Sequence, residues 1–304
     1  MPELHLHIGY PKTGTTSLQS TLEKSRKSLA GHGILFPATI DNRHRVLQAI
    51  GSPVQNKKID QKLQVSSDSE RADAIRKWLD GLAEEATSYH TVILSEETVA
   101  TRPLEEIAAI RDSLVPRFDE VHVHVGFREH ISFALSNYMQ RVRATFYHVP
   151  FRQYANSMAD KPFMSYSTVL AALREQFGAA RVHPLIYDSQ NNSAYNETLM
   201  KAMGVEGGTI ELVEEEFRNK TPDIGLLRLK QALNRQFDRV IREFGGQPGS
   251  AVHDTMVDAL ANIAIAAKLP LATRDDLLDL IPQPTKRAWA RDWAKLQEAV
   301  RVPA

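Results

Sequence analysis

The sequence carries its clearest chemical signal in a short loop near its start, Gly9-Tyr10-Pro11-Lys12-Thr13-Gly14-Thr15-Thr16-Ser17. The loop follows an apolar run that predicts a strand and opens a pattern that predicts a helix. Such a turn directs consecutive backbone N–H groups and the positive end of the helix at one place, which favours a bound anion. The two glycines allow the unusual backbone angles of a tight turn. Hydroxyl donors follow at Thr15, Thr16 and Ser17, so the loop predicts a phosphate site.

The place of its lysine separates this loop from the common nucleoside-triphosphate loop, which has lysine directly after the second glycine. Here Thr15 stands at that position, and Lys12 comes two residues before Gly14. The stretch resembles the 5′-phosphosulfate loop of sulfotransferases that use 3′-phosphoadenosine 5′-phosphosulfate (PAPS), typically Pro-Lys-(Ser/Thr)-Gly-Thr-Thr. The resemblance implies that the nucleotide is bound by Pro11, Lys12, Thr13, Gly14, Thr15, Thr16 and Ser17.

A second motif of that family binds the 3′-phosphate through an arginine that ends a strand and a serine on the next helix. Arg128 follows the apolar run Val121–Phe127, and Ser136 comes eight positions later. Arginine offers paired, permanently charged donors to a phosphate dianion, and serine adds a hydroxyl. The strand-like run Val182-His183-Pro184-Leu185-Ile186-Tyr187-Asp188 is a softer match, so the resemblance covers about Leu4 to Val205.

Transfer of a sulfuryl group resembles phosphoryl transfer, in which positioning and charge stabilisation dominate. Lys12 is expected to neutralise the charge that grows on the leaving nucleotide, PAP, and no metal is required. The acceptor must also lose a proton, and relatives use a glutamate or a histidine. Glu96 is our preferred base, with Glu97 beside it and His44 after the first helix as alternatives.

Alternating histidines also invite a metal hypothesis, because imidazole is a common metal ligand. His5 and His7 lie on one expected strand, and His122 and His124 lie on another. Such residues are more often neutral and hydrogen-bonded beneath packed helices, so we expect no metal site.

Apolar runs that alternate with amphipathic patterns position these residues. Strand, helix, strand at this spacing predicts an α/β fold with a central parallel sheet flanked by helices, and ligands bind at the carboxyl edge of such sheets. The expected strands are 4–10, 34–37, 91–96, 121–127 and 182–187. The expected helices are 16–29, 72–86, 105–114, 131–146 and 167–177.

The last third reads differently, because strand patterns stop after about Thr221. Helices are expected over 226–244, 251–268 and 286–300. We therefore expect a PAPS-binding core over 1–220 and a helical extension over 221–304 that packs on it. The polar segment Pro53–Asp73 is expected to be a mobile loop.

Composition restricts the partners. Lysine plus arginine equals aspartate plus glutamate at 37 each, so no global field favours nucleic acid or a membrane surface. The chain has no cysteine, which excludes disulfides and thiolate chemistry. No targeting segment or membrane span is visible, so a cytoplasmic location is expected. The acceptor is expected to be a small molecule or a saccharide.

Two other functions remain open. A kinase or nucleotide hydrolase would share the strand–loop–helix arrangement. Against that function, the loop of this chain lacks the lysine that clamps the β- and γ-phosphates in such enzymes. A non-catalytic nucleotide-binding protein would keep the fold and act through its helical last third. Neither the acceptor nor the oligomeric state follows from the sequence.

Overall fold

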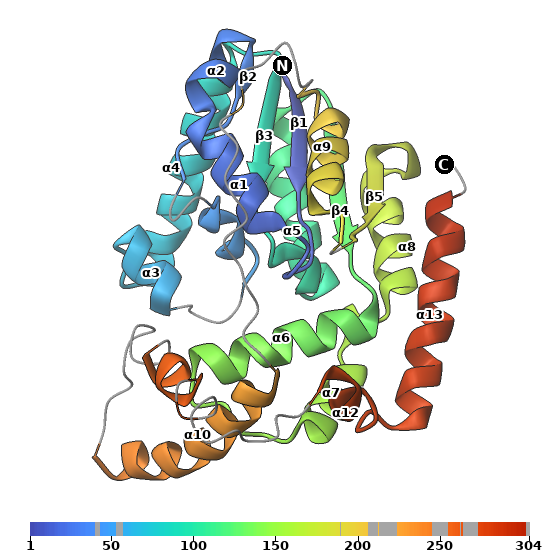
Figure 1. The fold of residues 1–304 in the computed structure, drawn as a ribbon. Helices are drawn as coiled ribbons and strands as arrows, with labels where there is room; N and C mark the ends of the chain where they lie inside the picture. The colour runs from blue at the N-terminus through green and yellow to red at the C-terminus, as the bar shows by residue number, and fades with distance from the viewer. Residues whose placement is uncertain are drawn as a thin grey trace. The chain divides into compact units, whose positions relative to one another are not determined.

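The computed structural model describes residues 1–39, 43–52, 57–188, 190–205, 212, 224–244, 255–261, 263 and 273–301. The chain forms two compact units, each assembled from separate stretches (Figure 1). The first unit comprises Met1–Arg128, Ser165–Phe217 and Ala294–Ala304, and the second comprises Glu129–Met164 and Arg218–Trp293. The boundary expected after residue 220 lies outside the described residues and stays a prediction.

A five-stranded sheet forms the centre of the first unit, in the order β2-β3-β1-β4-β5. Every neighbouring pair is parallel. The predicted fold class, a parallel sheet flanked by helices with a helical C-terminal region, is therefore confirmed. The strands are β1 (Glu3–His7), β2 (Ile34–Leu35), β3 (Thr91–Ser95), β4 (Val121–Phe127) and β5 (Val182–Ile186).

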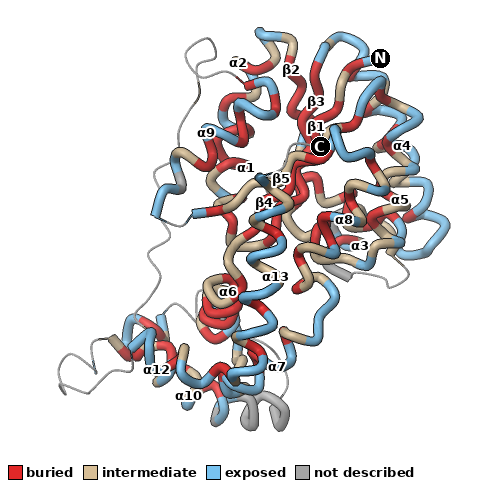
Figure 2. Tube along the Cα trace, turned by 90° about the vertical axis from the view of Figure 1, so that its right-hand side faces the viewer, coloured by how far each residue is buried: buried red, intermediate tan, exposed pale blue. Residues whose placement is uncertain are grey.

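Helices cover both faces of this sheet (Figure 2). On one side lie α1 (Thr15–Lys24), α2 (Arg26–Gly31) and α9 (Asn192–Ala202). On the other side lie α4 (Asp68–Ala86), α5 (Leu104–Leu114) and α8 (Tyr166–Phe177). Because neighbouring strands are parallel, their carboxyl ends share one edge, and the loop after β1 is at that edge.

The two faces of β1 differ in chemistry, because successive side chains of a strand point to opposite faces. Leu4 and Leu6 face one way, and His5 and His7 face the other, with His5 in register with Ile93. Ile93 packs in the apolar cluster that contains Leu18 of α1 and residues of α9. The histidines therefore lie between the sheet and the layer formed by α1, α2 and α9.

The segment expected to be a mobile loop is largely helical, so that prediction was wrong. Helix α3 (Lys57–Leu63) occupies its middle, and α4 begins at Asp68. The Ser67 side chain accepts a hydrogen bond from the Glu70 N–H, which caps α4. An ion pair joins the buried Arg71 of α4 to Asp60 of α3. The low apolar content hid helices that are held by capping and charge pairing.

The remaining short elements complete the first unit. The expected helix 16–29 is two helices that meet at Ser25, and β1 ends three residues earlier than expected. Single turns of 3₁₀ helix are η1 (Arg45–Gln48), η2 (Val99–Thr101), η3 (Val115–Arg117) and η5 (Ala179–Arg181).

The described part of the second unit is helical. Its elements are α6 (His130–Ala144), α7 (Phe151–Ala159), η4 (Pro162–Met164), α10 (Ile224–Phe244), α12 (Arg274–Leu278) and the first part of α13 (Gln283–Arg301). Of the helix expected over 251–268, residues 255–261 and 263 are helical and the rest lie outside the described residues. None of the helices in the described ranges combines the length and hydropathy that crossing a bilayer requires.

Helix α10 holds the carboxyl end of α6. The buried Lys230 Nζ donates to the Val142 and Thr145 carbonyls at 2.9 and 3.1 Å, and the Asn234 amide donates to the same two oxygens. A cation is favourable where a helix leaves carbonyls without partners. In the same unit, the Arg141 guanidinium lies over the rings of Tyr147 and of Tyr154 in α7.

The buried histidines of the first unit predict a loss of stability in mild acid. Burial lowers the pKa of both His7 and His44 from 6.5 to about 4. Below pH 6.5 the unfolded chain binds protons that the folded chain excludes, so stability present at pH 7 is lost as the pH falls. Each of the two should remove about 2 kcal/mol by pH 5, at roughly 1.4 kcal/mol per pH unit. Urea unfolding at pH 7 and pH 5 measures this, and equal unfolding free energies would contradict it.

Candidate functional site

The loop between β1 and α1 has the backbone of an anion site. Hydrogen bonds from Ile8 N–H and Tyr10 N–H to carbonyls of β4 continue the sheet pairing beyond His7. Lys12 has φ 71° and Gly14 has φ 75°, so both lie in the left-handed region. Gly14 precedes the first helical residue of α1, and no side chain caps this end of the helix. The first N–H groups of α1 are thus available to an anion.

The left-handed Lys12 is itself informative. Only a few per cent of residues other than glycine adopt positive φ, at a cost of roughly 1–2 kcal/mol. The fold bears this conformational cost at Lys12, and the left-handed backbone fixes the direction in which the lysine side chain leaves the loop. Strain of this kind gathers at ligand sites.

The hydroxyls of the loop divide between its two sides. Thr13 Oγ1 donates to the Tyr10 carbonyl at 2.6 Å and lies 3.4 Å from Thr15 Oγ1, and both side chains are buried. Thr16 is exposed and Ser17 is partly exposed. Thr13 and Thr15 therefore support the loop from within, whereas Thr16 and Ser17 face outward.

Helix α9 supports the loop from below. Burial raises the pKa of the Tyr195 hydroxyl, which lies beside Thr13. This approach needs a glycine at position 126 of β4, because a Cβ there would overlap the Tyr195 hydroxyl oxygen. Sequence reasoning missed Tyr195, since only the fold brings α9 beneath the loop.

The end of β4 also contacts the loop. Arg128 Nη1 donates to the Lys12 carbonyl at 2.9 Å, and its guanidinium lies 5.4 Å from the centre of the Tyr187 ring. The structure thus brings Arg128 next to the predicted phosphate loop. Ser136 lies on α6, in the second unit. Its pairing with Arg128 stays a prediction from the sequence.

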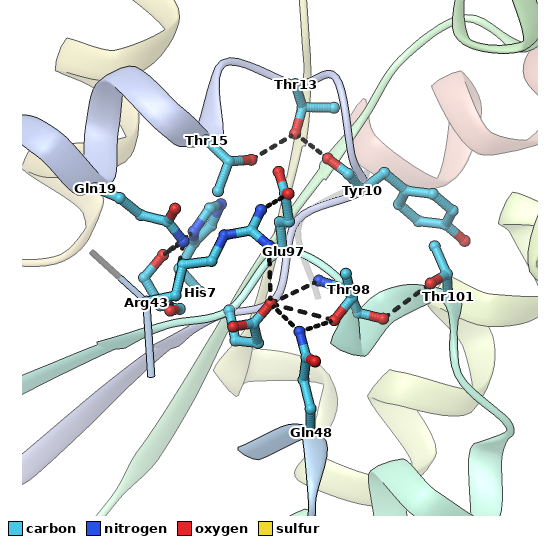
Figure 3. A network of polar contacts seen from close by, with 12 residues as sticks. His7, Tyr10, Thr13, Thr15, Gln19, Arg43, Gln48, Glu97, Thr98 and Thr101 are labelled. Atoms are coloured by element: carbon cyan, nitrogen blue, oxygen red, sulfur yellow. Dashed lines mark hydrogen bonds and ion pairs between the residues drawn. The ribbon is translucent and has the colours of Figure 1, made fainter. Parts of the chain in front are cut away.

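The carboxyl end of β3 brings together the two glutamates that were candidate bases. The fully buried Glu96 accepts hydrogen bonds at Oε1 from Gln48 Nε2 at 2.8 Å and Thr98 Oγ1 at 3.2 Å. Its Oε2 has no hydrogen-bond partner among the described residues. Glu97 forms an ion pair with Arg43, whose Nη1 lies 3.7 Å from Glu96 Oε1. Figure 3 shows Arg43 and Glu97 near Thr13 and Thr15 of the loop.

His44, the third candidate base, is held at both ring nitrogens by backbone. Ser95 N–H donates to Nδ1 at 2.9 Å, and Nε2 lies 3.3 Å from the Pro37 carbonyl. The ring is buried, and burial lowers its pKa to about 4. This geometry gives the imidazole a positioning role between β2 and β3.

A second network lies on the face of the sheet beneath α1. Ser95 Oγ lies 2.8 Å from His7 Nδ1 and 3.0 Å from Gln19 Nε2, so it joins β1, β3 and α1. Sequence reasoning missed Gln19 and Ser95. The signals were present, since a serine ends an otherwise apolar strand and a glutamine lies one turn into α1, on the buried side.

The other four histidines on the strands form two pairs. His5 Nδ1 lies 2.8 Å from His124 Nε2, and His122 Nδ1 lies 2.9 Å from His183 Nε2, with the rings stacked. In the described ranges, no group of three or more histidine, aspartate or glutamate side chains is arranged to hold a metal ion.

Comparison with known proteins gave structural matches alone. No protein-family model matches the chain, and no curated protein sequence matches it significantly. A sulfotransferase from Alicyclobacillus acidocaldarius is similar at 12% identity and TM-score 0.46, over 86% of this chain and 95% of that one. The sulfotransferase domain of the Synechococcus PCC 7002 olefin synthase is similar at 17% identity and TM-score 0.40, over 92% and 93%. A sulfotransferase domain from the curacin biosynthetic pathway is similar at 14% identity and TM-score 0.38, over 92% of this chain and 96% of that one.

Similarity at this level carries no argument about activity. The sheet order and the helices on both faces establish the α/β fold from the chain's own geometry. The chemistry has to come from the residues at the carboxyl edge of that sheet.

Proposed function

We propose that this chain is a sulfotransferase that moves a sulfuryl group from PAPS to a hydroxyl or amine of an acceptor and releases PAP. One observation carries the proposal: the loop after β1 has its lysine at position 12, in a left-handed backbone, and a buried threonine at position 15. A triphosphate loop needs lysine at position 15. A lysine at position 12 lies over the front of the loop instead, so the loop favours a nucleotide whose 5′ group contacts the lysine there.

In this proposal the loop holds the 5′-phosphosulfate. The backbone N–H groups that follow Gly14 point at its oxygens, and Thr16 and Ser17 add hydroxyls. Arg128, together with Ser136, binds the 3′-phosphate. The bond between Arg128 and the Lys12 carbonyl supports this assignment, because it ties a permanent cation to the loop at the edge of the sheet.

Lys12 acts on the charge that develops during transfer. As the bond between sulfur and the bridging oxygen breaks, negative charge gathers on PAP, and the ammonium group neutralises it. The acceptor oxygen attacks sulfur in line from the opposite side. The loop and Arg128 contribute by holding the nucleotide still, which removes much of the entropic barrier.

Glu96 is the proposed base. Gln48 and Thr98 orient one carboxylate oxygen, which leaves Oε2 as the oxygen to take the acceptor's proton. Glu97 is a weaker choice, since Arg43 pairs more closely with it than with Glu96. In His44 the Nδ1 lone pair is already used by the Ser95 N–H. Because Glu96 is fully buried, the acceptor has to enter far enough to reach it.

The first test is ligand-dependent stability. PAP should raise the melting temperature, because a ligand that binds only the folded chain at a hundredfold over its Kd adds ~2.7 kcal/mol. Magnesium-ATP should raise it much less, since the loop lacks the lysine that clamps β- and γ-phosphates. Differential scanning fluorimetry measures both. A melting point that rises with magnesium-ATP and ignores PAP would instead support a kinase.

A further inference from the structure

The hydrogen atoms of the network beneath the loop can be assigned from its contacts. Gln19 Nε2 lies 3.0 Å from Ser95 Oγ and 3.4 Å from the Ser95 carbonyl, which only accepts, so the amide nitrogen is on this side. Since Gln19 donates to the Ser95 hydroxyl, that hydroxyl has its own hydrogen to give. His7 Nδ1, at 2.8 Å, is the acceptor that the described residues offer it. His7 therefore carries its hydrogen on Nε2.

This Nε2–H is buried, and it has no acceptor among the described residues. Such a donor destabilises a fold, so it calls for an explanation. The nitrogen faces the start of the phosphate loop: a Cβ built on Gly9 would lie 2.7 Å from His7 Nε2 and 3.2 Å from Thr13 Oγ1. Any side chain at position 9 would push the ring away. Gly9 thus lets an imidazole N–H approach the loop from below.

The loop also has no lysine on its inner side. The position that carries lysine in triphosphate loops is the buried Thr15, which faces Thr13. Figure 3 shows His7 next to Gln19, on the side of the loop where Thr15 begins α1. A donor from β1 is therefore placed where this loop has no lysine.

We propose that His7 is a binding residue of the phosphate loop, whose neutral Nε2–H donates to the 5′ anion while Ser95 and Gln19 fix the ring. The proposal rests on the proposed function for the identity of the nucleotide, but it requires only an anion in the loop. The His7 imidazole is neutral at pH 7 because burial lowers its pKa to about 4.

The test compares ligands with and without a 5′ group. His7→Leu should weaken PAP by about tenfold to a hundredfold, the range for a hydrogen bond to a charged group. It should leave adenosine 3′-monophosphate, which has no 5′-phosphate, unchanged. His7→Gln keeps an N–H at the ε position and should restore most of the PAP affinity. His5→Leu is the matched control, on the same face of β1 but two residues further from the loop, and it should change neither affinity. Calorimetric titration measures all four proteins.

A second measurement uses the wild-type chain, in case the variants do not fold. In ¹⁵N-labelled protein the His7 Nε2–H signal should shift to low field with PAP or with sulfate, and should not shift with adenosine 3′-monophosphate. If PAP fails to bind but sulfate still moves the signal, the proposed nucleotide is wrong and the role of His7 stands. If PAP binds while the signal stays fixed, or if His7→Leu weakens both nucleotides equally, the role of His7 is overturned and the sulfotransferase proposal stands.

Discussion

Replacing Lys12 by alanine should lower the turnover of sulfuryl transfer by about 100- to 1,000-fold, the usual effect of removing one donor that stabilises transition-state charge. The ammonium group meets charge that is larger in the transition state than in bound PAPS, so kcat should fall much more than PAP affinity. The measurement is PAP release with an acceptor identified by a screen with labelled PAPS. PAP affinity is measured separately by titration.

The left-handed backbone at position 12 calls for a second variant. Alanine keeps the unfavourable φ of 71° that lysine has, whereas glycine relieves it. Lys12→Gly should therefore show the same loss of turnover in a more stable loop. The hydrogen bond from Arg128 to the carbonyl of residue 12 does not involve the side chain of residue 12, so it should persist in both variants. A loss that appears in KM alone, with kcat unchanged, would mean that Lys12 binds the nucleotide without acting on the transition state.

The fold was predictable because its signals are local. Five apolar runs, each of strand length and separated by helical patterns, predict a parallel sheet, and the strands formed where those runs lie. The errors came where local pattern competes with contacts made in the folded chain. The segment Pro53–Asp73 looks like a polar loop, but the Ser67 cap and the Asp60–Arg71 pair stabilise helices over Lys57–Leu63 and from Asp68 onward. The order of residue types along the sequence does not predict that ion pair.

The candidate site was predictable in part for the same reason. The loop 9–17 is contiguous, so its residue types alone predict an anion site, and the end of β3 offers glutamates at a strand terminus. The residues that orient them come from elsewhere: Gln48 and Arg43 reach Glu96 and Glu97 from a segment about fifty residues earlier. The buried state of His44 likewise depends on Ser95 and Pro37, which the sequence does not bring together.

Replacing Glu96 by glutamine should reduce turnover by about 10²–10⁴-fold, the usual contribution of a general base. Glutamine keeps the shape of the carboxylate and an oxygen that Gln48 and Thr98 can donate to, so the fold and PAP affinity should persist. The acidic limb of the pH–rate profile should disappear in this variant, because that limb follows protonation of the base. Stopped PAP-release assays across a pH range of about 5 to 9 measure the profile.

Matched variants then separate Glu96 from its two neighbours. Glu97→Gln removes the closer of the two carboxylates that pair with Arg43 but no proposed proton acceptor, so the acidic limb should remain. His44→Asn keeps an oxygen for the Ser95 N–H but removes the buried ring, so it should lower the free energy of unfolding. It should leave the pH–rate profile unchanged. An acidic limb that survives in Glu96→Gln and vanishes in Glu97→Gln would assign the base to Glu97, with Arg43 displaced when the acceptor binds. Full activity of Glu96→Gln with an acidic phenol would mean that this acceptor ionises unaided, because a phenol of low pKa needs no protein base to lose its proton. The nucleotide site would be unaffected by that outcome, since neither the loop nor Arg128 takes part in removing the proton.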